Sequence, residues 1–133
     1  MKAISVVGER VEWTEHDGPR PGPGEVLIRV RATAVNRADL LQRAGAYPVP
    51  PGASPILGLE CAGEIQSIGS GVTRCAIGDP VCALLSGGGY AEQVVVPEGQ
   101  VLPIPDGLDF VKAAAIPEVF ATAWLNLYRE GGL

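Results

Sequence analysis

The sequence predicts a mainly β domain with short helices, and three observations lead to this fold class. First, 18 glycines and 12 prolines account for 30 of the 133 residues, and both residue types interrupt helices. Second, short β-branched runs alternate with polar residues over most of the chain, which is typical of half-buried strands. Third, strands do not alternate with long helices, which excludes a doubly wound parallel sheet within these residues.

The first part of the chain predicts three strands. Residues 2–7 and 11–15 are short β-branched segments separated by a turn, so they are expected to pair. The Gly- and Pro-rich stretch 18–24 suits neither a helix nor a central strand and predicts an extended surface connection. Residues 25–35 give the clearest alternation of aliphatic and polar side chains, which predicts the most regular strand.

A helical period replaces this alternation at residue 36. Asn36 can cap a short helix that continues to Ala44, and Gly45 can end it. A Pro-rich loop that contains Tyr47 follows, over 46–58. Further strands are expected at 58–69, 80–84, 90–96 and 101–104.

The sequence pattern becomes typical of helices again from residue 109. A short helix is expected over 110–115, and Pro117 suits the first position of a second helix. Glu118 is expected to be a first-turn residue that interacts favourably with the helix dipole. The second helix carries an apolar stripe made of Val119, Phe120, Ala123, Trp124, Leu127 and Tyr128.

Composition and charge exclude several classes of protein. The net charge of −5 argues against a nucleic-acid partner, because phosphate binding needs a basic face. No run of 18 apolar residues exists, so no membrane span is expected, and charges at Glu9 and Arg10 come too early for a signal peptide. The three cysteines form no CxxC pair, which favours free thiols in a reducing compartment and a cytoplasmic location.

Residue types that carry chemistry are sparse. A zinc site needs three or four ligands, whereas the sequence offers three scattered cysteines and His16, which we expect in a solvated turn. The Gly-rich stretches 69–71 and 87–89 lie between expected strands and lack a phosphate-binding pattern, so tight turns are expected there. Cys61 and Cys82 lie in apolar strands without an activating base, which favours buried, inert thiols.

Seven stretches that together span nearly the whole chain carry a family resemblance. They are residues 23–30, 34–43, 45–54, 56–63, 77–81, 88–92 and 113–118. Taken together and in this order, they resemble the N-terminal half of medium-chain dehydrogenase/reductases, in the zinc-free quinone oxidoreductase branch. Residues 36–40 and 50–54 are most similar to the tumour-suppressor-inducible NADPH quinone oxidoreductase subgroup.

This resemblance implies a GroES-like, partly open β-barrel over residues 1–116, with 117–133 a helix that leads towards a Rossmann domain. Asn36 stands where zinc-dependent relatives have a cysteine, and Leu59 stands where they have a histidine. The four-cysteine structural zinc lobe is also missing. Together with the low ligand count, the resemblance implies an enzyme without a metal.

The resemblance also implies roles for individual residues. Tyr47 matches the active-site tyrosine and would donate a hydrogen bond to the reduced carbonyl oxygen, and Asn36 matches the residue beside the nicotinamide and substrate. Thr122 matches a position facing the cofactor. Each residue also has a purely structural alternative. Tyr47 could pack on neighbouring prolines, Asn36 could cap the helix, and Thr122 could serve in helix packing. Glu60 either has a catalytic role or pairs with a cation such as Arg37.

The function implied is NADPH-dependent hydride transfer to a quinone or α,β-unsaturated carbonyl. The 133 residues alone are expected to be inactive, because NADPH would bind mostly to the Rossmann domain. The apolar helical stripe is expected to pack partly on the barrel and partly on that domain. A homodimer of the full-length form is left open. The alternative is a stand-alone GroES-like binding or scaffolding module without catalysis, since fold alone does not define function.

Overall fold

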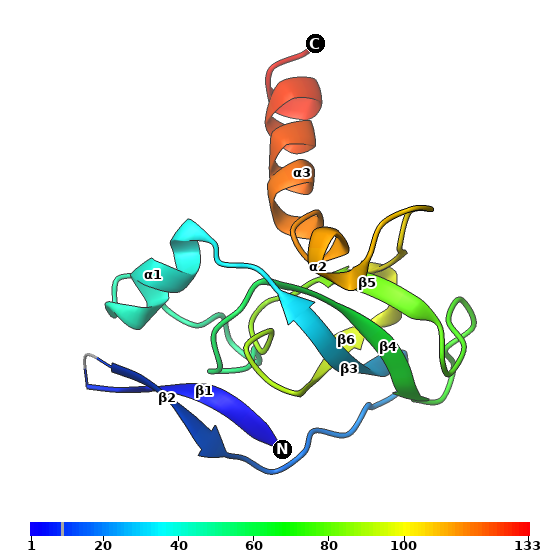
Figure 1. The fold of residues 1–133 in the computed structure, drawn as a ribbon. Helices are drawn as coiled ribbons and strands as arrows, with labels where there is room; N and C mark the ends of the chain where they lie inside the picture. Colours follow the sequence, from blue (N-terminus) through cyan, green and yellow to red (C-terminus); the bar gives the residue numbers. More distant parts are fainter. Residues whose placement is uncertain (9) are drawn as a thin grey trace.

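The computed structural model describes residues 1–8 and 10–133. Its chain begins with a two-stranded antiparallel hairpin of β1 (Lys2–Val7) and β2 (Arg10–Glu15) (Figure 1). The hairpin is attached to the rest of the molecule through the backbone of residues 90–92. Ile4 N–H donates to the Tyr90 carbonyl at 2.8 Å, and Glu92 N–H donates to the Lys2 carbonyl at 3.0 Å.

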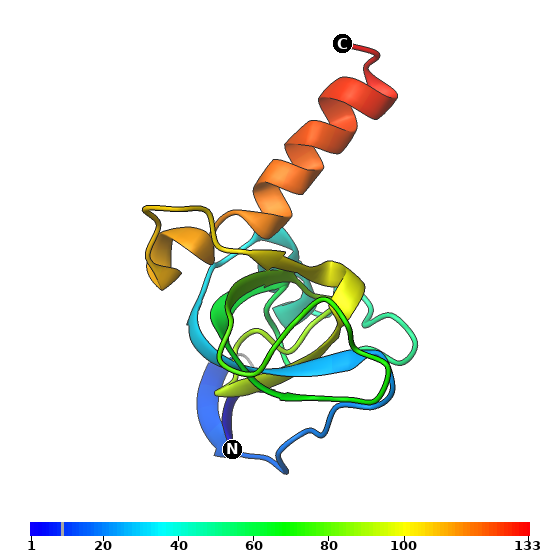
Figure 2. The ribbon, with the colours of Figure 1, turned by 90° about the vertical axis from the view of Figure 1, so that its right-hand side faces the viewer.

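The larger sheet has five antiparallel strands in the order β6-β3-β4-β5-β7. Strands β6 and β7 form its two edges, yet only a three-residue 3₁₀ turn, η1, separates them in the chain. So short a connection can join the edges only if the sheet curls round and brings them near each other (Figure 2). In the sheet order of the described residues the two edge strands do not pair, so the barrel stays partly open. The strands are β3 (Glu25–Thr33), β4 (Glu60–Ile68), β5 (Pro80–Leu84), β6 (Gln93–Pro97) and β7 (Val101–Pro103), with η1 at Glu98–Gln100.

The core lies inside this curled sheet, where each strand contributes every second side chain. Alternate burial of this kind follows from the two-residue period of a strand and matches the alternation in the sequence. A smaller apolar cluster lies on the other side, against helix α2 (Phe110–Ala113). The buried core residues are Val26, Ile28, Cys61, Ile65, Val81, Ala83, Leu85, Val94, Val96 and Val101.

Strands β3 and β4 approach closely at Gly63. Their register shifts between Val30 and Ala32, and a Cβ atom on Gly63 would overlap the backbone carbonyl of Arg29. Only glycine fits the backbone here, because any larger residue would push the two central strands apart. Gly63 thus allows β3 and β4 to approach closely near the end of β3 that leads to the first helix.

Two helical segments extend from the barrel. Helix α1 (Arg37–Arg43) follows β3, and helix α3 (Pro117–Trp124) continues into a π-helical segment, η2 (Leu125–Glu130). In both ribbon views α3 and η2 project away from the sheets (Figures 1 and 2). None of the helices in the described residues is long and apolar enough to cross a membrane.

The sequence prediction of a mainly β, GroES-like, partly open barrel is confirmed. The expected strand boundaries differ by one to three residues at several ends, and the clearest differences are at the start of two strands. Strand β4 begins at Glu60 rather than residue 58, and β6 begins at Gln93 rather than residue 90. The physical reason is the close approach of the backbone at Gly58 to the stretch 87–90, since a Cβ on Gly58 would overlap the backbone at Gly89 and Tyr90.

The expectation that the apolar stripe of α3 packs partly on the barrel is wrong. Only Pro117 at the start of the helix is buried and Glu118 is half-buried, whereas every residue from Val119 to Leu133 is exposed. Phe120 and Trp124 are 65% and 56% exposed. The helix therefore leaves the barrel after its first turn.

Candidate functional site

Asn36 lies at the junction between β3 and α1, where the chain turns from a strand into a helix. It is the N-cap residue of α1 in an extended conformation (φ −112°, ψ 158°) and is buried. Its side-chain Nδ2 donates to Glu60 Oε1 at 2.8 Å. The capping role expected from the sequence is confirmed, and the amide group in addition bonds to a carboxylate from a different strand.

Asp39, in the first turn of α1, is a buried carboxylate with three donors. Its Oδ2 accepts from the Asn36 backbone N–H at 2.8 Å and from the Tyr90 hydroxyl at 2.9 Å, and its Oδ1 accepts from Gly58 N–H at 3.1 Å. Asp39 is 2% exposed. These bonds fix the start of α1 against the backbone at Gly58 and the side chain of Tyr90, and Asp39 in turn holds the backbone N–H of Asn36.

Glu60 is the second buried carboxylate, at 1% exposure. Its Oε1 accepts from Asn36 and its Oε2 accepts from the backbone N–H of Glu118 at 3.0 Å. The first N–H groups of a helix have no partner within the helix, and Glu60 supplies one from outside. The expected pairing of Glu60 with Arg37 or another cation is wrong, because these two N–H donors occupy its oxygens instead.

Sequence reasoning assigned no role to the Tyr90–Asp39 pair. Burial, together with the hydrogen bond to Asp39, raises the pKa of the Tyr90 phenol above its ordinary value. The bond between Asp39 and the Asn36 backbone could have been predicted from the Asn-x-x-Asp spacing of these residues. An acidic side chain three residues after an N-cap can reach back to the N–H of the cap. Tyr90 carried no such signal, because its partner lies 51 residues away.

The other two predicted site residues lie on separate elements. Tyr47 is in the loop after α1 and is 38% exposed. Thr122 lies on the exposed part of α3, and its carbonyl accepts from Asn126 Nδ2 at 2.8 Å. No hydrogen bond among the described residues links Tyr47, Thr122 and Asn36. The chain thus presents the buried amide of Asn36, held by its bond to Glu60, and two exposed residues with hydroxyl groups, Tyr47 on the loop after α1 and Thr122 on α3.

The three cysteines are free thiols. Burial, with smaller contributions from Cys82 and Glu60, raises the pKa of the Cys61 thiol to about 12. Burial also raises the pKa of Cys82 and of the half-buried Cys75. The prediction that Cys61 and Cys82 are buried is therefore confirmed, and a thiol with a raised pKa is a poor nucleophile. Among the residues that the structure describes, no group of three or more His, Cys, Asp and Glu side chains could hold a metal ion.

His16 is half-buried at the end of the hairpin, which corrects its expected place in a solvated turn. Its Nε2 lies 2.9 Å from both Ser5 Oγ and Thr14 Oγ1, and these two hydroxyls are 2.6 Å apart. No carboxylate among the described residues bonds the His16 ring. The ring holds the two strands of the hairpin together through their hydroxyl groups.

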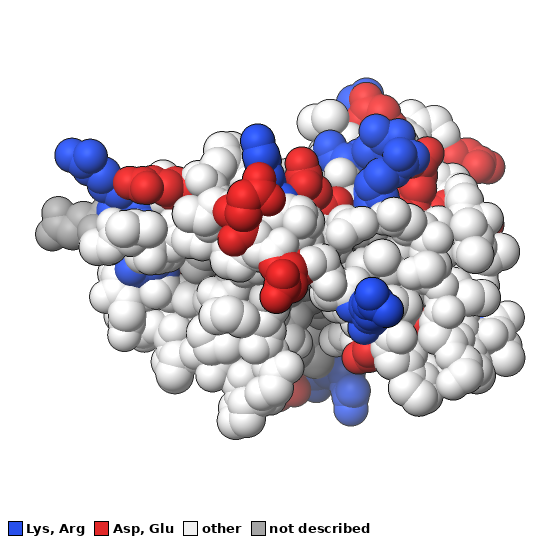
Figure 3. Space-filling model, turned by 90° about the horizontal axis from the view of Figure 1, so that it is seen from below, with Lys and Arg blue, Asp and Glu red and all other residues white. Residues whose placement is uncertain are grey.

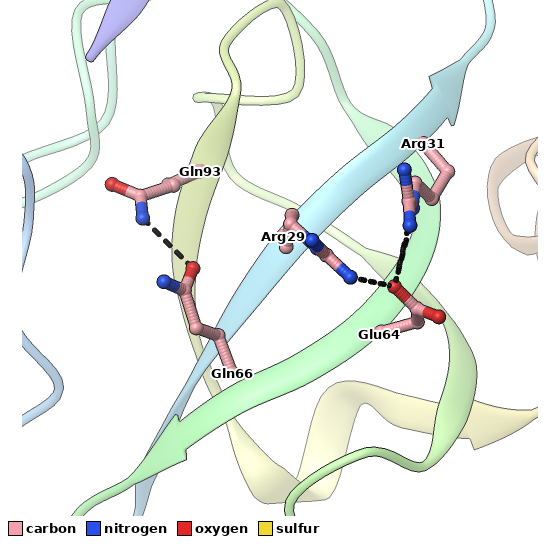
Figure 4. Close-up of polar contacts among 5 residues, drawn as sticks. All are labelled: Arg29, Arg31, Glu64, Gln66 and Gln93. Carbon is pink, nitrogen blue, oxygen red and sulfur yellow. Dashed lines mark hydrogen bonds and ion pairs between the residues drawn. The ribbon is translucent and has the colours of Figure 1, made fainter.

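A polar cluster on the outer face of the sheet is the most charged feature of β3 and β4. Arg29 Nη2 and Arg31 Nη2 lie 2.5 and 3.0 Å from the same oxygen of Glu64, and Gln93 donates to Gln66 at 2.8 Å (Figure 4). The hydrogen bond from Arg29 lowers the pKa of Glu64. The two arginines and Gln66 are exposed, Glu64 and Gln93 are half-buried, and the groups satisfy one another, so they form a surface network rather than an anion site.

Acidic and basic side chains lie next to one another on the face shown in Figure 3, between large neutral areas. An apolar cleft of about 360 Å³ lies between the hairpin and β3, with Trp13, Val30 and Tyr90 in its lining. Sequence reasoning did not predict this cleft, because it forms between two separate sheets.

Residues 22–106 match the family described as the alcohol dehydrogenase GroES-like domain. This chain belongs to that family. The resemblance to medium-chain dehydrogenase/reductases is therefore confirmed. The match begins before β3 and ends after β7, so it includes the Asn36, Asp39 and Glu60 network.

Curated relatives agree with this assignment. The chain is 43% identical over 110 residues to a quinone oxidoreductase of Pseudomonas aeruginosa, which covers 81% of the chain and 33% of the relative. It is 39% identical over 115 residues to the synaptic vesicle membrane protein VAT-1 homolog of Rattus norvegicus, and this match covers 86% of the chain and 28% of the relative. The chain thus spans about a third of the length of these two relatives.

Solved structures have the same fold. The human synaptic vesicle membrane protein VAT-1 homolog-like protein matches with a TM-score of 0.92 and 34% identity, over all of this chain and 44% of that chain. The quinone oxidoreductase of Thermus thermophilus, also solved in complex with NADPH, matches with a TM-score of 0.80 and 38% identity. This match covers 99% of this chain and 42% of that chain. Both likenesses extend over α3 as well as the barrel.

Proposed function

We propose that this chain is the catalytic domain of an NADPH-dependent reductase that transfers hydride to a quinone or α,β-unsaturated carbonyl without a metal. The observation that carries the proposal is the Asn36–Glu60 pair. In this pair a buried carboxylate holds a neutral amide, and the family resemblance implies a cysteine at the same position in zinc-dependent relatives. The likeness to quinone oxidoreductases, one of them solved with NADPH, supports the choice of reaction and cofactor.

The donor set fits the nicotinamide end of such a cofactor. Asn36 Nδ2 has a second hydrogen beyond the one given to Glu60, and the hydroxyls of Tyr47 and Thr122 belong to exposed residues. NADPH, when bound, would supply the hydride. Asn36 and Thr122 would orient the nicotinamide, and Tyr47 would donate a hydrogen bond to the carbonyl oxygen as negative charge develops there.

A complete active site needs more protein than these residues. We propose that residues 1–116 are the catalytic barrel and that 117–133 lead into a Rossmann domain, which would hold the phosphates and most of NADPH. The 133 residues alone are then inactive, and their apolar helical stripe packs against that domain. We place the enzyme in the cytoplasm, consistent with three free thiols.

The experiment uses the polypeptide that the native source produces, after its intact mass has been measured. We expect a mass well above 13.8 kDa and oxidation of NADPH only in the presence of a quinone or enone acceptor. Removal of metals with a chelator should leave kcat unchanged. A native mass of 13.8 kDa without turnover would favour the alternative of a binding or scaffolding module, and activity restored only by zinc would contradict metal independence.

A further inference from the structure

We propose that Glu60 is a positioning residue that makes the orientation of the Asn36 amide depend on how helix α3 is seated on the barrel. The relevance of Asn36 and α3 to the reaction rests on the proposed function, whereas the linkage itself is a property of this chain. Glu60 is the only residue in the described hydrogen bonds whose carboxylate joins the barrel's α1 junction to α3.

The two bonds of Glu60 reach far apart in the sequence. Its partner Asn36 lies 24 residues before it and its partner Glu118 lies 58 residues after it. Burial of a carboxylate without a cation is costly unless N–H groups satisfy it. A purely apolar side chain could fill the same volume, so packing alone does not account for a glutamate at this position.

The bond to Asn36 decides which way the amide faces. With Nδ2 towards Glu60 the amide donates, at 2.8 Å, to a carboxylate oxygen. The opposite orientation would place the amide carbonyl against that oxygen, and two acceptors repel each other. Glu60 therefore sets the direction of the remaining amide hydrogen, which is the one the proposed reaction would use.

The bond to Glu118 depends on the seat of α3. Ile116, the N-cap residue, has no side chain that could bond to the first N–H groups, and Pro117 occupies the first helical position. Glu60 consequently acts as the cap of α3, where a negative charge is also favoured by the helix dipole. Because α3 touches the barrel only in its first turn, a tilt of the helix would act directly on this bond.

These facts predict a transmitted effect. If α3 shifts, Glu60 Oε2 loses or moves its donor, the carboxylate turns, and Asn36 follows because the other oxygen holds it. Asn36 and Thr122, the two residues proposed to contact the nicotinamide, then move together. Asp39 gives no such linkage, since its partners are Asn36, Gly58 and Tyr90, all within the barrel.

Nuclear magnetic resonance on the 133-residue chain tests the linkage without any need for activity. The two signals are the side-chain NH₂ resonances of Asn36 and the hydrogen-exchange rate of the Glu118 amide. Glu60→Gln replaces one acceptor with a donor, so we expect exchange at Glu118 at least about tenfold faster, or an Asn36 amide released from its bond, or both. Glu118→Gln is the matched control. It makes the same change of a carboxylate to an amide, but the donor to Glu60 is the backbone N–H of residue 118, which this substitution leaves in place.

The coupling is then tested from the helix side. Pro117→Gly loosens the seat of α3, and we expect it to shift the Asn36 NH₂ resonances in the wild-type background but not in Glu60→Gln. Val119→Ala, an exposed change in the same turn, should leave them unchanged. A shift that persists in Glu60→Gln, or no shift in either background, would overturn the proposal. If Glu60→Gln does not fold, the comparison of Pro117→Gly with Val119→Ala decides alone.

Failure of the proposed function would look different. In that case the polypeptide would not turn over NADPH, while the resonance shifts would still appear. If the enzyme is active and the linkage is real, Glu60→Gln should lower kcat without abolishing the binding of NADPH. An active enzyme whose kcat is unaffected by Glu60→Gln would refute the positioning role.

Discussion

The Tyr90 hydroxyl donates to Asp39 Oδ2 at 2.9 Å and so ties the segment after β5 to the first turn of α1. Asp39 has no cation among its described partners, and each of its three donors is needed to offset its burial. Asp39, which accepts a bond from the Asn36 backbone N–H, therefore depends on a tyrosine that lies 51 residues later in the chain.

Tyr90→Phe should lower the free energy of unfolding by about 1–3 kcal/mol, because it leaves a buried carboxylate with one donor fewer. Tyr128→Phe is the control, since Tyr128 is 54% exposed on the projecting helix. Urea titrations of both variants measure the effect. Equal stabilities of the two variants would show that the Tyr90 bond is dispensable.

The raised pKa of Tyr90 gives a pH dependence at the alkaline end. Below pH 10.0, the ordinary pKa of the phenol, both folded and unfolded chains keep the proton, and the stabilisation is fully present. Above it, the unfolded chain releases the proton first, so the free energy of unfolding falls as pH rises towards the pKa of the folded state. Tyr90→Phe should flatten this fall above about pH 10, and an unchanged slope of the unfolding free energy against pH would contradict the assignment to Tyr90.

Thiol reactivity should rank the three cysteines by burial. At about pH 8 we expect iodoacetamide to modify the half-buried Cys75 first, while Cys61 and Cys82 react about a hundredfold more slowly or only on unfolding. Burial and a pKa of about 12 both protect Cys61. Mass spectrometry of digested samples gives the three rates. Modification of Cys61 as fast as Cys75 would contradict the buried position.

Gly63→Ala should destabilise the barrel by more than about 3 kcal/mol, because the added Cβ would overlap the backbone of Arg29 between the two central strands. Gly99→Ala is the matched control, since nothing lies within 4 Å of its added Cβ. Thermal unfolding of the two variants measures the difference. Similar melting temperatures would mean that β3 and β4 are farther apart than described.

The exposed face of α3 should make the isolated chain associate with itself. Val119, Phe120 and Trp124 are 47%, 65% and 56% exposed, which is unusual for side chains of this size on one helix. Light scattering coupled to size-exclusion chromatography should show mass increasing with concentration. The double change Phe120→Ser and Trp124→Ser should reduce it, and a clean monomer at high concentration would count against the account.

Local pattern predicted the elements of this fold because alternation, glycine and proline act over a few residues. The strand at 25–35 and the cap at Asn36 are examples. The contacts of Glu60 were not predictable in this way, because its donors lie 24 and 58 residues distant. The full exposure of the α3 stripe was also not predicted, since an apolar stripe indicates that something covers a helix but does not say what covers it.

The proposed hydride transfer, with Tyr47 as the hydrogen-bond donor to the carbonyl oxygen, is tested most directly by kcat for Tyr47→Phe in the complete polypeptide with NADPH and a quinone. Tyr47 is 38% exposed, so removal of its hydroxyl should change stability by less than about 0.5 kcal/mol. We expect kcat to fall about a hundredfold, because the reduced oxygen loses its hydrogen-bond donor. An unchanged kcat in an equally stable variant would contradict the role of Tyr47 and the active site built around it.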